Sequence, residues 1–183
     1  VIKKFSNKKK ILFFDCGCNY GFYSLYVASL SKENKIISIE ASKNTFNEFE
    51  KNILLNNFLN IKKFNKAVSY IDDQVITFNE SEKDWESSIS HNNFSTYRPY
   101  KVNSVKIDTL AKDHKLENYK TIIKLDIEGN EMNAIRGSLD LIHKSSPLII
   151  IEFSKYIFDK YDNIEYFKNF LIDCDYSIYD TNY

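Results

Sequence analysis

Apolar and polar residues alternate in blocks along this chain, and the blocks predict strands and helices in turn. Short apolar runs are typical of strands buried on both faces, whereas apolar residues spaced three and four apart are typical of helices. We therefore expect strands at residues 11–15, 36–40, 61–69, 121–128, 147–153 and 176–179. We expect helices at residues 21–30, 45–57, 108–114, 131–141 and 164–173. Such alternation predicts an α/β fold with a doubly wound, mostly parallel sheet.

The stretch at about residues 70–106 interrupts this alternation. Residues 74–78 and 101–107 look like strands around a polar loop, so we expect a β-rich insertion after the third strand. It leaves from the carboxyl end of that strand, where ligands bind in such folds, and we expect it to fold over the ligand crevice. Within the helices, Thr45 and Glu48 predict a capping box, and Asp108 predicts a cap for the helix that it starts.

The bulk composition is that of one globular domain. Of 183 residues, 43% are hydrophobic and 27% charged, and we expect an N-terminal arm at 1–10 and a single domain at 11–183. The formal net charge is zero, which argues against a nucleic-acid partner. We expect no membrane span, because no apolar run approaches the length of one. Three cysteines, an odd number, indicate reduced thiols and a cytoplasmic location.

The run ILFFDCGCNYGFYS at residues 11–24 carries the first candidate chemistry. A dinucleotide fingerprint would need glycine at positions 17, 19 and 22, and here those residues are Gly17, Asn19 and Phe22. Asp15 before the turn would repel a pyrophosphate, but it suits a ligand with an ammonium and a sulfonium. Glu40 ends the second strand, where its oxygens can accept hydrogen bonds from ribose hydroxyls. These features favour S-adenosylmethionine; the alternative is an unrelated strand–turn–helix with Glu40 as a surface acid.

The run KLDIEGNE at residues 124–131 is the second unusual segment. Three acids and a lysine at the end of an apolar strand are costly unless the charges are paired or used. The alternative here is an ion pair of Lys124 together with acids that cap the next helix. A Mg²⁺ site is a further alternative that clustered acids alone do not establish, and we predict no metal. Its ligands would be Asp126, Glu128, Glu131 and Glu152.

With these two segments, the chain resembles the FkbM-type methyltransferase family. The resemblance rests on FFDCGCNYGFYS, SIEAS, LLNNFLNIKKFNKAVS, the Ser-Ser pair near Trp85, VKIDTL, IIKLDIEGNEMNAIRGS and IIIEF, and it spans residues 11–153. It implies a Rossmann-like enzyme that uses S-adenosylmethionine, typically to methylate a hydroxyl of a sugar, glycan or secondary metabolite. One departure is that Ala41 and Ser42 follow Glu40, where the family usually has proline.

These arguments give two sets of candidate site residues. We predict that the cofactor contacts Asp15, Gly17, Asn19, Gly21, Glu40, Ala67, Ser88 and Asp126. The candidates for taking a proton from the acceptor hydroxyl are Asp126, Glu128, Glu152 and His91. Aromatic residues of the insertion, Trp85, Tyr97 and Tyr100, either stack on a sugar or anchor the loop.

Two other functions remain open from the sequence. One is a methyltransferase that acts on RNA or protein, which the neutral charge and the absence of an Asn-Pro-Pro-Tyr-type strand end disfavour. The other is a non-catalytic binding module that keeps the fold, which the intact cofactor residues disfavour. Methyl acceptor and oligomeric state cannot be read from these residues.

Overall fold

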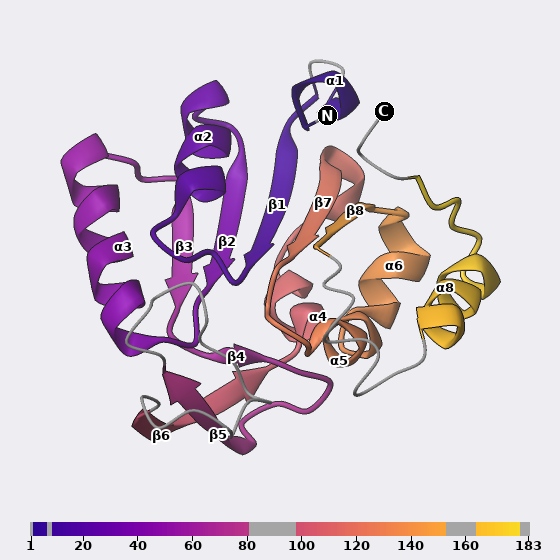
Figure 1. Ribbon diagram of the computed structural model, residues 1–183. Coiled ribbons are helices and arrows are strands. Elements are labelled where there is room, and N and C mark those ends of the chain that lie inside the picture. Colours follow the sequence, from indigo (N-terminus) through magenta and orange to yellow (C-terminus); the bar gives the residue numbers. More distant parts are fainter. Residues whose placement is uncertain (1, 7–8, 81–97, 153–163, 180–183) are drawn as a thin grey trace. The chain divides into compact units, whose positions relative to one another are not determined.

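A parallel sheet forms the centre of the first of two compact units in this chain. The computed structural model describes residues 2–6, 9–80, 98–152 and 164–179, and the units are residues 1–152 and 153–183. Five described strands pair in the order β3-β2-β1-β7-β8, and all neighbours are parallel (Figure 1). Their bounds are β1 (Ile11–Cys16), β2 (Lys35–Ile39), β3 (Ile61–Phe64), β7 (Lys120–Leu125) and β8 (Leu148–Ile151). The predicted α/β fold is confirmed.

Apolar side chains fill both faces of this sheet. Phe13 of β1 packs with Val27 and Ala28, and Ile2 joins the same cluster. Phe14 points to the opposite face, because side chains alternate along a strand, and it is fully buried as well. The helices of this unit are α1 (Ile2–Ser6), α2 (Phe22–Leu30), α3 (Lys43–Asn56), α4 (Ile107–Ala111), the 3-10 helix η2 (Leu116–Asn118), α5 (Glu131–Arg136) and α6 (Leu139–Ser145).

The third predicted strand, at residues 61–69, is divided between two sheets. Its first part is β3, and its second part is β4 (Ala67–Val68), which pairs with β6 (Arg98–Val105). Between them, the Asn65 amide donates to the carbonyls of Glu40 and Ala41 and fixes the point where the chain leaves the parallel sheet. Strand β5 (Val75–Glu80) pairs antiparallel with β6 and completes the β-rich insertion.

Helix α3 begins earlier than predicted, and the proposed capping box is wrong. Ser42 is the N-cap residue, and its hydroxyl accepts the Thr45 N–H at 3.2 Å. Thr45 therefore lies inside the first turn, and Glu48 pairs with Lys51 at 2.6 Å. A serine directly before the helix satisfies an N–H that has no partner within the helix, so it takes the position that we had given to Thr45.

Two further predicted helices differ because of tertiary contacts. Helix α4 starts at Ile107, and the Asp108 carboxylate instead accepts the N–H groups of Asp140 and Leu141, at the start of α6. The helix predicted at residues 131–141 is two helices, α5 and α6, which separate at Gly137. A side chain at Gly137 would collide with the Ser69 carbonyl, so glycine lets the chain pass close to Ser69 at the point where the two helices separate.

The strand predicted at residues 121–128 ends at Leu125, so Asp126 and Glu128 lie in the loop beyond it. In the second unit, α8 (Ile164–Asp173) matches its predicted range, whereas residues 176–179 form no strand. A search of the described helices finds none with the length and apolar character that crossing a membrane requires.

Candidate functional site

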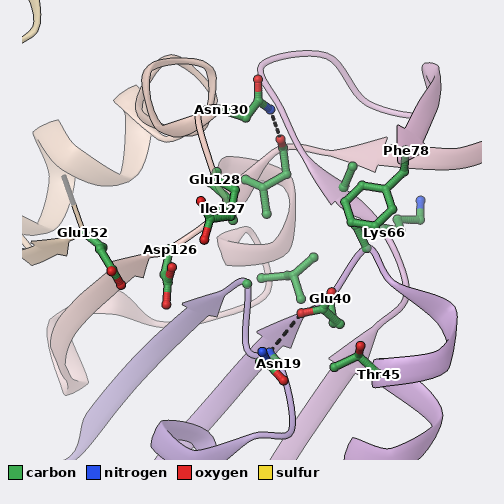
Figure 2. A pocket seen from close by; sticks show the side chains of 15 residues that line it. Asn19, Glu40, Thr45, Lys66, Phe78, Asp126, Ile127, Glu128, Asn130 and Glu152 are labelled. Atoms are coloured by element: carbon green, nitrogen blue, oxygen red, sulfur yellow. Dashed lines mark hydrogen bonds between the residues drawn. The ribbon is translucent and has the colours of Figure 1, made fainter. Parts of the chain in front are cut away.

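A cavity of about 340 Å³ opens at the carboxyl ends of the parallel strands in the first unit. Two sets of residues line opposite parts of it (Figure 2). We call one the Glu40 wall: Gly17, Asn19 and Glu40. We call the other the Asp126 wall: Asp126, Glu128 and Glu152. Further lining residues are Ile39, Ala41, Thr45, Lys66, Ala67, Val68, Phe78, Ile127 and Asn130.

The Glu40 wall is held together by backbone hydrogen bonds. The N–H of Gly17 donates to the carbonyl of Ile39 at 2.9 Å, which ties the loop after β1 to the end of β2. One oxygen of the Glu40 carboxylate accepts the Asn19 N–H at 2.9 Å, and the other accepts the Ser42 N–H at 2.8 Å. A carboxylate offers about four acceptor positions, so both oxygens keep capacity for a ligand's hydroxyl groups.

Burial of Glu40 changes its chemistry. The residue is 9% exposed, and burial raises the pKa of its carboxyl to about 7 despite the two hydrogen bonds, which act in the opposite direction. Hydroxyl donors stabilise the ionised form. Two hydroxyls on neighbouring carbons would therefore convert this carboxyl to the carboxylate that binds them.

Close approach of the two walls depends on Gly17. Its φ is +73°, and a side chain at this position would collide with the backbone carbonyl of Asp126. Gly21, with φ +89°, is close-packed for a different reason, because a side chain there would strike the ring of Phe49 in α3. The sequence predicted Gly21 as a cofactor contact, but it does not line the cavity.

Asp15 is fully buried below the cavity and is not among its lining residues. Its carboxylate accepts a hydrogen bond from the Ser24 hydroxyl at 2.6 Å and lies 3.8 Å from the Lys124 ammonium. Desolvation raises its pKa, although the positive charge of Lys124 counteracts this. A cofactor contact at Asp15 has no support in this arrangement, in which the carboxylate acts on the site through Lys124.

The Asp126 wall carries more exposed carboxylates. Asp126 forms an ion pair with Lys124 at 3.0 Å, as the paired-charge alternative anticipated, and its side chain remains 31% exposed. The pKa of Glu152 is raised, first by the negative charge of Asp126, then by burial and by a hydrogen bond with Asp126. Figure 2 shows these two carboxyl groups side by side at one end of the cavity.

Glu131 supports the loop after β7, which carries Asp126 and Glu128. This residue is 3% exposed, and its carboxylate accepts the N–H groups of Ile127 and Gly129, each at 3.2 Å. Glu128 within the loop has φ 52°, an unusual backbone conformation for a residue other than glycine. Asn130 then donates to the carbonyl of Val68 at 2.6 Å and joins the loop to the insertion.

The cavity thus brings together most of the predicted site residues. Of the cofactor set, Gly17, Asn19, Glu40, Ala67 and Asp126 line it, as do Glu128 and Glu152 of the catalytic set. Ser88 and His91, with Trp85 and Tyr97, lie outside the described residues. The hydroxyl of Tyr100 donates to the Ala41 carbonyl and accepts the Lys43 N–H, so this residue anchors the insertion.

Sequence reasoning missed several lining residues. Lys66, which pairs with Asp73 at 2.7 Å, lies in the LLNNFLNIKKFNKAVS stretch but was not among the predicted site residues. Phe78 reaches the cavity from β5 of the insertion, where no motif marks it. Thr45 was assigned to a helix cap. Asn130 stands inside the quoted KLDIEGNE run, which was a usable signal. No cluster of three or more His, Cys, Asp or Glu that suits a metal occurs in the part of the chain that the structure describes.

The residues that line the cavity fit S-adenosylmethionine. Four carboxyl-bearing residues line the cavity (Glu40, Asp126, Glu128 and Glu152), with Lys66 as the lining cation, so a positively charged ligand is favoured over a pyrophosphate. Apolar atoms of Ile39, Val68 and Phe78 provide a surface for a flat base next to the Glu40 carboxylate. The volume of about 340 Å³ lies within the range of small-molecule sites.

Two solved structures are similar to this chain at low sequence identity. Precorrin-6y C5,15-methyltransferase from Geobacter metallireducens GS-15 is 12% identical with a TM-score of 0.54, over 95% of this chain and 68% of that one. A SAM-dependent methyltransferase from Aquifex aeolicus is 11% identical with a TM-score of 0.49, over 98% and 79%. Among curated proteins, none matches.

The family comparison is more specific than these similarities of fold. The Methyltransferase FkbM domain matches residues 15–178, which is most of the chain. The match includes the end of β1, all of β2 and the loop after β7, so it covers both walls of the cavity. The predicted family and cofactor are thereby confirmed: the chain belongs to the FkbM family of S-adenosylmethionine-dependent methyltransferases.

Proposed function

We propose that this protein methylates a hydroxyl oxygen of a sugar, glycan or secondary metabolite. The observation that carries the proposal is the pair of walls: a buried ribose-binding carboxyl at Glu40 faces solvent-reachable acids at Asp126, Glu128 and Glu152. The neutral charge of the chain and its reduced, unpaired cysteines support a cytoplasmic enzyme acting on a small molecule rather than on nucleic acid. We also propose that residues 11–183 work as one methyltransferase domain, with 1–10 as an arm.

Each wall has its own task in this reaction. When bound, S-adenosylmethionine supplies a methyl group on a sulfonium, which is already activated for in-line displacement. Glu40 and Asn19 hold the ribose end, and Gly17 keeps the walls close. The acids of the Asp126 wall orient the acceptor and take the proton of its hydroxyl as the oxygen attacks. Asp126 is the best placed of them, because Lys124 fixes its carboxylate at 3.0 Å.

Thermal unfolding with S-adenosylhomocysteine tests the cofactor wall. This product is expected to raise the melting temperature of the wild-type protein, because a ligand that binds the folded state stabilises it by mass action. Glu40→Ala should abolish the shift, whereas Glu48→Ala, on the exposed surface of α3, should keep it. An undiminished shift in Glu40→Ala, or stabilisation by NAD alone, would contradict the proposal.

Transfer of a labelled methyl group to glycan and small-molecule mixtures tests the acid wall. Asp126→Asn and Glu128→Gln should each lower turnover while S-adenosylhomocysteine still binds. Removing a general base typically costs about 10²- to 10⁴-fold in rate. If neither substitution changes the rate, these acids take no part in the reaction.

A further inference from the structure

Two aromatic rings at the start of α2 stand exposed beside the Asp126 wall. Phe22 is 77% exposed and Tyr23 is 44% exposed, and their rings form an edge-to-face pair with centroids 5.4 Å apart. Single exposed apolar side chains are common on protein surfaces, but two adjacent exposed rings make a local apolar surface. Neither residue lines the cavity that fits the cofactor.

Lys124 connects this ring pair to the reacting acids. Its ammonium lies 5.3 Å from the centroid of the Tyr23 ring and 3.0 Å from the Asp126 carboxylate. The ring and the carboxylate therefore contact the same buried cation from different sides. The same lysine lies 3.8 Å from Asp15 of β1, the strand that pairs with β7, so its ammonium stands between the ring pair and the Asp126 wall.

We propose that Phe22 and Tyr23 form the acceptor platform of this enzyme, on which the ring of a neutral sugar stacks while its hydroxyls reach Asp126. This proposal rests on the proposed function, and it adds the residues that hold the acceptor and the class of substrate for the same site. One face of a pyranose ring is a layer of C–H groups, which packs on the electron-rich face of an aromatic ring. The edge of the sugar carries the hydroxyl groups.

The charges beside the platform select the class of acceptor. Asp126, Glu128 and Glu152 offer several acceptor oxygens within one cavity, so an acceptor with several hydroxyl donors satisfies more of them than a single phenol does. An anionic acceptor would meet like charges at this wall, which is unfavourable. A neutral polyhydroxyl ring fulfils both conditions.

The chain offers a matched control on the same helix. Tyr26 is 43% exposed, almost the same as Tyr23, but it lies one turn further along α2, away from the strand ends. Tyr23→Phe keeps the ring and removes only the hydroxyl. The four variants of the test are Phe22→Ala, Tyr23→Ala, Tyr23→Phe and Tyr26→Ala. The three side chains that they change are exposed, so the variants should fold.

Saturation-transfer NMR on the protein loaded with S-adenosylhomocysteine tests the platform, with methyl glucoside, methyl mannoside and catechol as probes. A methyl glycoside should bind, with the C–H protons of one ring face most strongly saturated. Phe22→Ala and Tyr23→Ala should each weaken binding by roughly three- to tenfold, the effect of a lost ring contact. Tyr23→Phe and Tyr26→Ala should bind as the wild type does.

Contrary results are distinguishable from failure of the proposed function. If wild-type protein and variants show the melting shift with S-adenosylhomocysteine, the cofactor site is intact. With the cofactor site intact, sugar binding by Phe22→Ala and Tyr23→Ala as strong as by the wild type would overturn the platform. Binding of catechol without either sugar, or no probe bound at all, would overturn the sugar class. Loss of the melting shift in the wild type would instead contradict the proposed function.

Discussion

The two walls of the cavity are built in opposite ways. Glu40 is 9% exposed, and each of its oxygens already holds a backbone N–H, so its position is set before a ligand arrives. Asp126 has a side chain that is 31% exposed, and its carboxylate is held by the side chains of Lys124 and Glu152. A preordered wall loses little entropy when it binds a cofactor, whereas a wall that exchanges protons must stay within reach of water. Binding and proton transfer thus impose different demands on one cavity.

The difference should be largest when Lys124 is removed. Lys124→Met leaves Asp15 buried without its cation, and breaking a buried ion pair typically costs about 3–5 kcal/mol of the free energy of unfolding. Urea denaturation measures this loss. Burial alone would lower the pKa of Lys124, but Asp15 and Asp126 more than offset it and leave the pKa raised, so the charge is present at neutral pH.

The double variant Asp15→Asn/Lys124→Met is the control for this prediction. It removes both buried charges and should recover part of the lost stability, because the cost comes from the unpaired carboxylate. If the single and the double variants are equally unstable, the ion pair is not what holds the two strands in place. Lys124 meets the Glu40 wall at the Gly17 carbonyl, 3.5 Å from its ammonium, whereas the hydrogen bonds that hold the Glu40 carboxylate come from Asn19 and Ser42. S-adenosylhomocysteine should therefore still bind the folded fraction.

Gly17→Ala should bring the next largest effect, because it disturbs both walls together. The new methyl group meets the Asp126 carbonyl, and the backbone is held at φ +73°, which favours glycine. We expect a loss of about 2–3 kcal/mol in the free energy of unfolding, together with weaker binding of S-adenosylhomocysteine. Urea denaturation measures the loss of stability, and calorimetric titration measures the affinity for S-adenosylhomocysteine. Normal affinity in the variant would show that the walls need not lie so close.

The sequence predicted the residues of both walls but not the contacts around them. Glu40 and the 126–131 loop were found because polar residues end apolar strands, and parallel strands share one edge. The pairing of Asp15 with Lys124 was not foreseen, because it depends on the register between β1 and β7, which sequence alone does not give. Phe78 was missed for a similar reason, since it reaches the cavity only because the insertion folds as a second sheet.

Local patterns failed where a distant segment decides the structure. The helix at 131–141 has continuous helical periodicity, yet Gly137 meets the Ser69 carbonyl and the helix is divided. Asp108 has the sequence position of a cap, but its carboxylate serves the start of α6. Both segments face the insertion or a neighbouring helix, so contacts made after folding override the local preference.

A smaller effect should appear in the pH dependence of cofactor binding. Burial raises the pKa of Glu40 to about 7, and hydroxyl donors bind the ionised form, so affinity for S-adenosylhomocysteine should fall toward tenfold for each pH unit below it. The folding stability of the unliganded protein should depend on pH in the opposite direction. The folded state holds this proton more tightly than the unfolded state, so stability from Glu40 is lost as pH rises from 4.5 to about 7.

Glu40→Gln, which cannot ionise, is the control for this titration. It should bind more weakly at pH 8 and show a flat profile between pH 5.5 and 8 wherever Glu40 is the titrating group. Calorimetry at several pH values measures both proteins. A profile in the variant that is as steep as in the wild type would assign the titration to another residue, and Glu40 would not then be the group whose ionisation controls cofactor binding.

The smallest expected effect lies within the Asp126 wall and leaves stability almost unchanged. The negative charge of Asp126 is the main reason that the pKa of Glu152 is raised, so Asp126→Asn should move that pKa back toward its ordinary value. Carbon-13 NMR of the glutamate carboxyl groups measures the shift directly, with Glu152→Gln identifying the signal. Because Glu152 is exposed, its protonation has little effect on the free energy of unfolding. The protonation state of Glu152 does decide which of the two carboxyl groups can take a proton. An unmoved Glu152 signal would mean that the charge of Asp126 is not what raises the pKa of Glu152, and that the two carboxyl groups titrate separately.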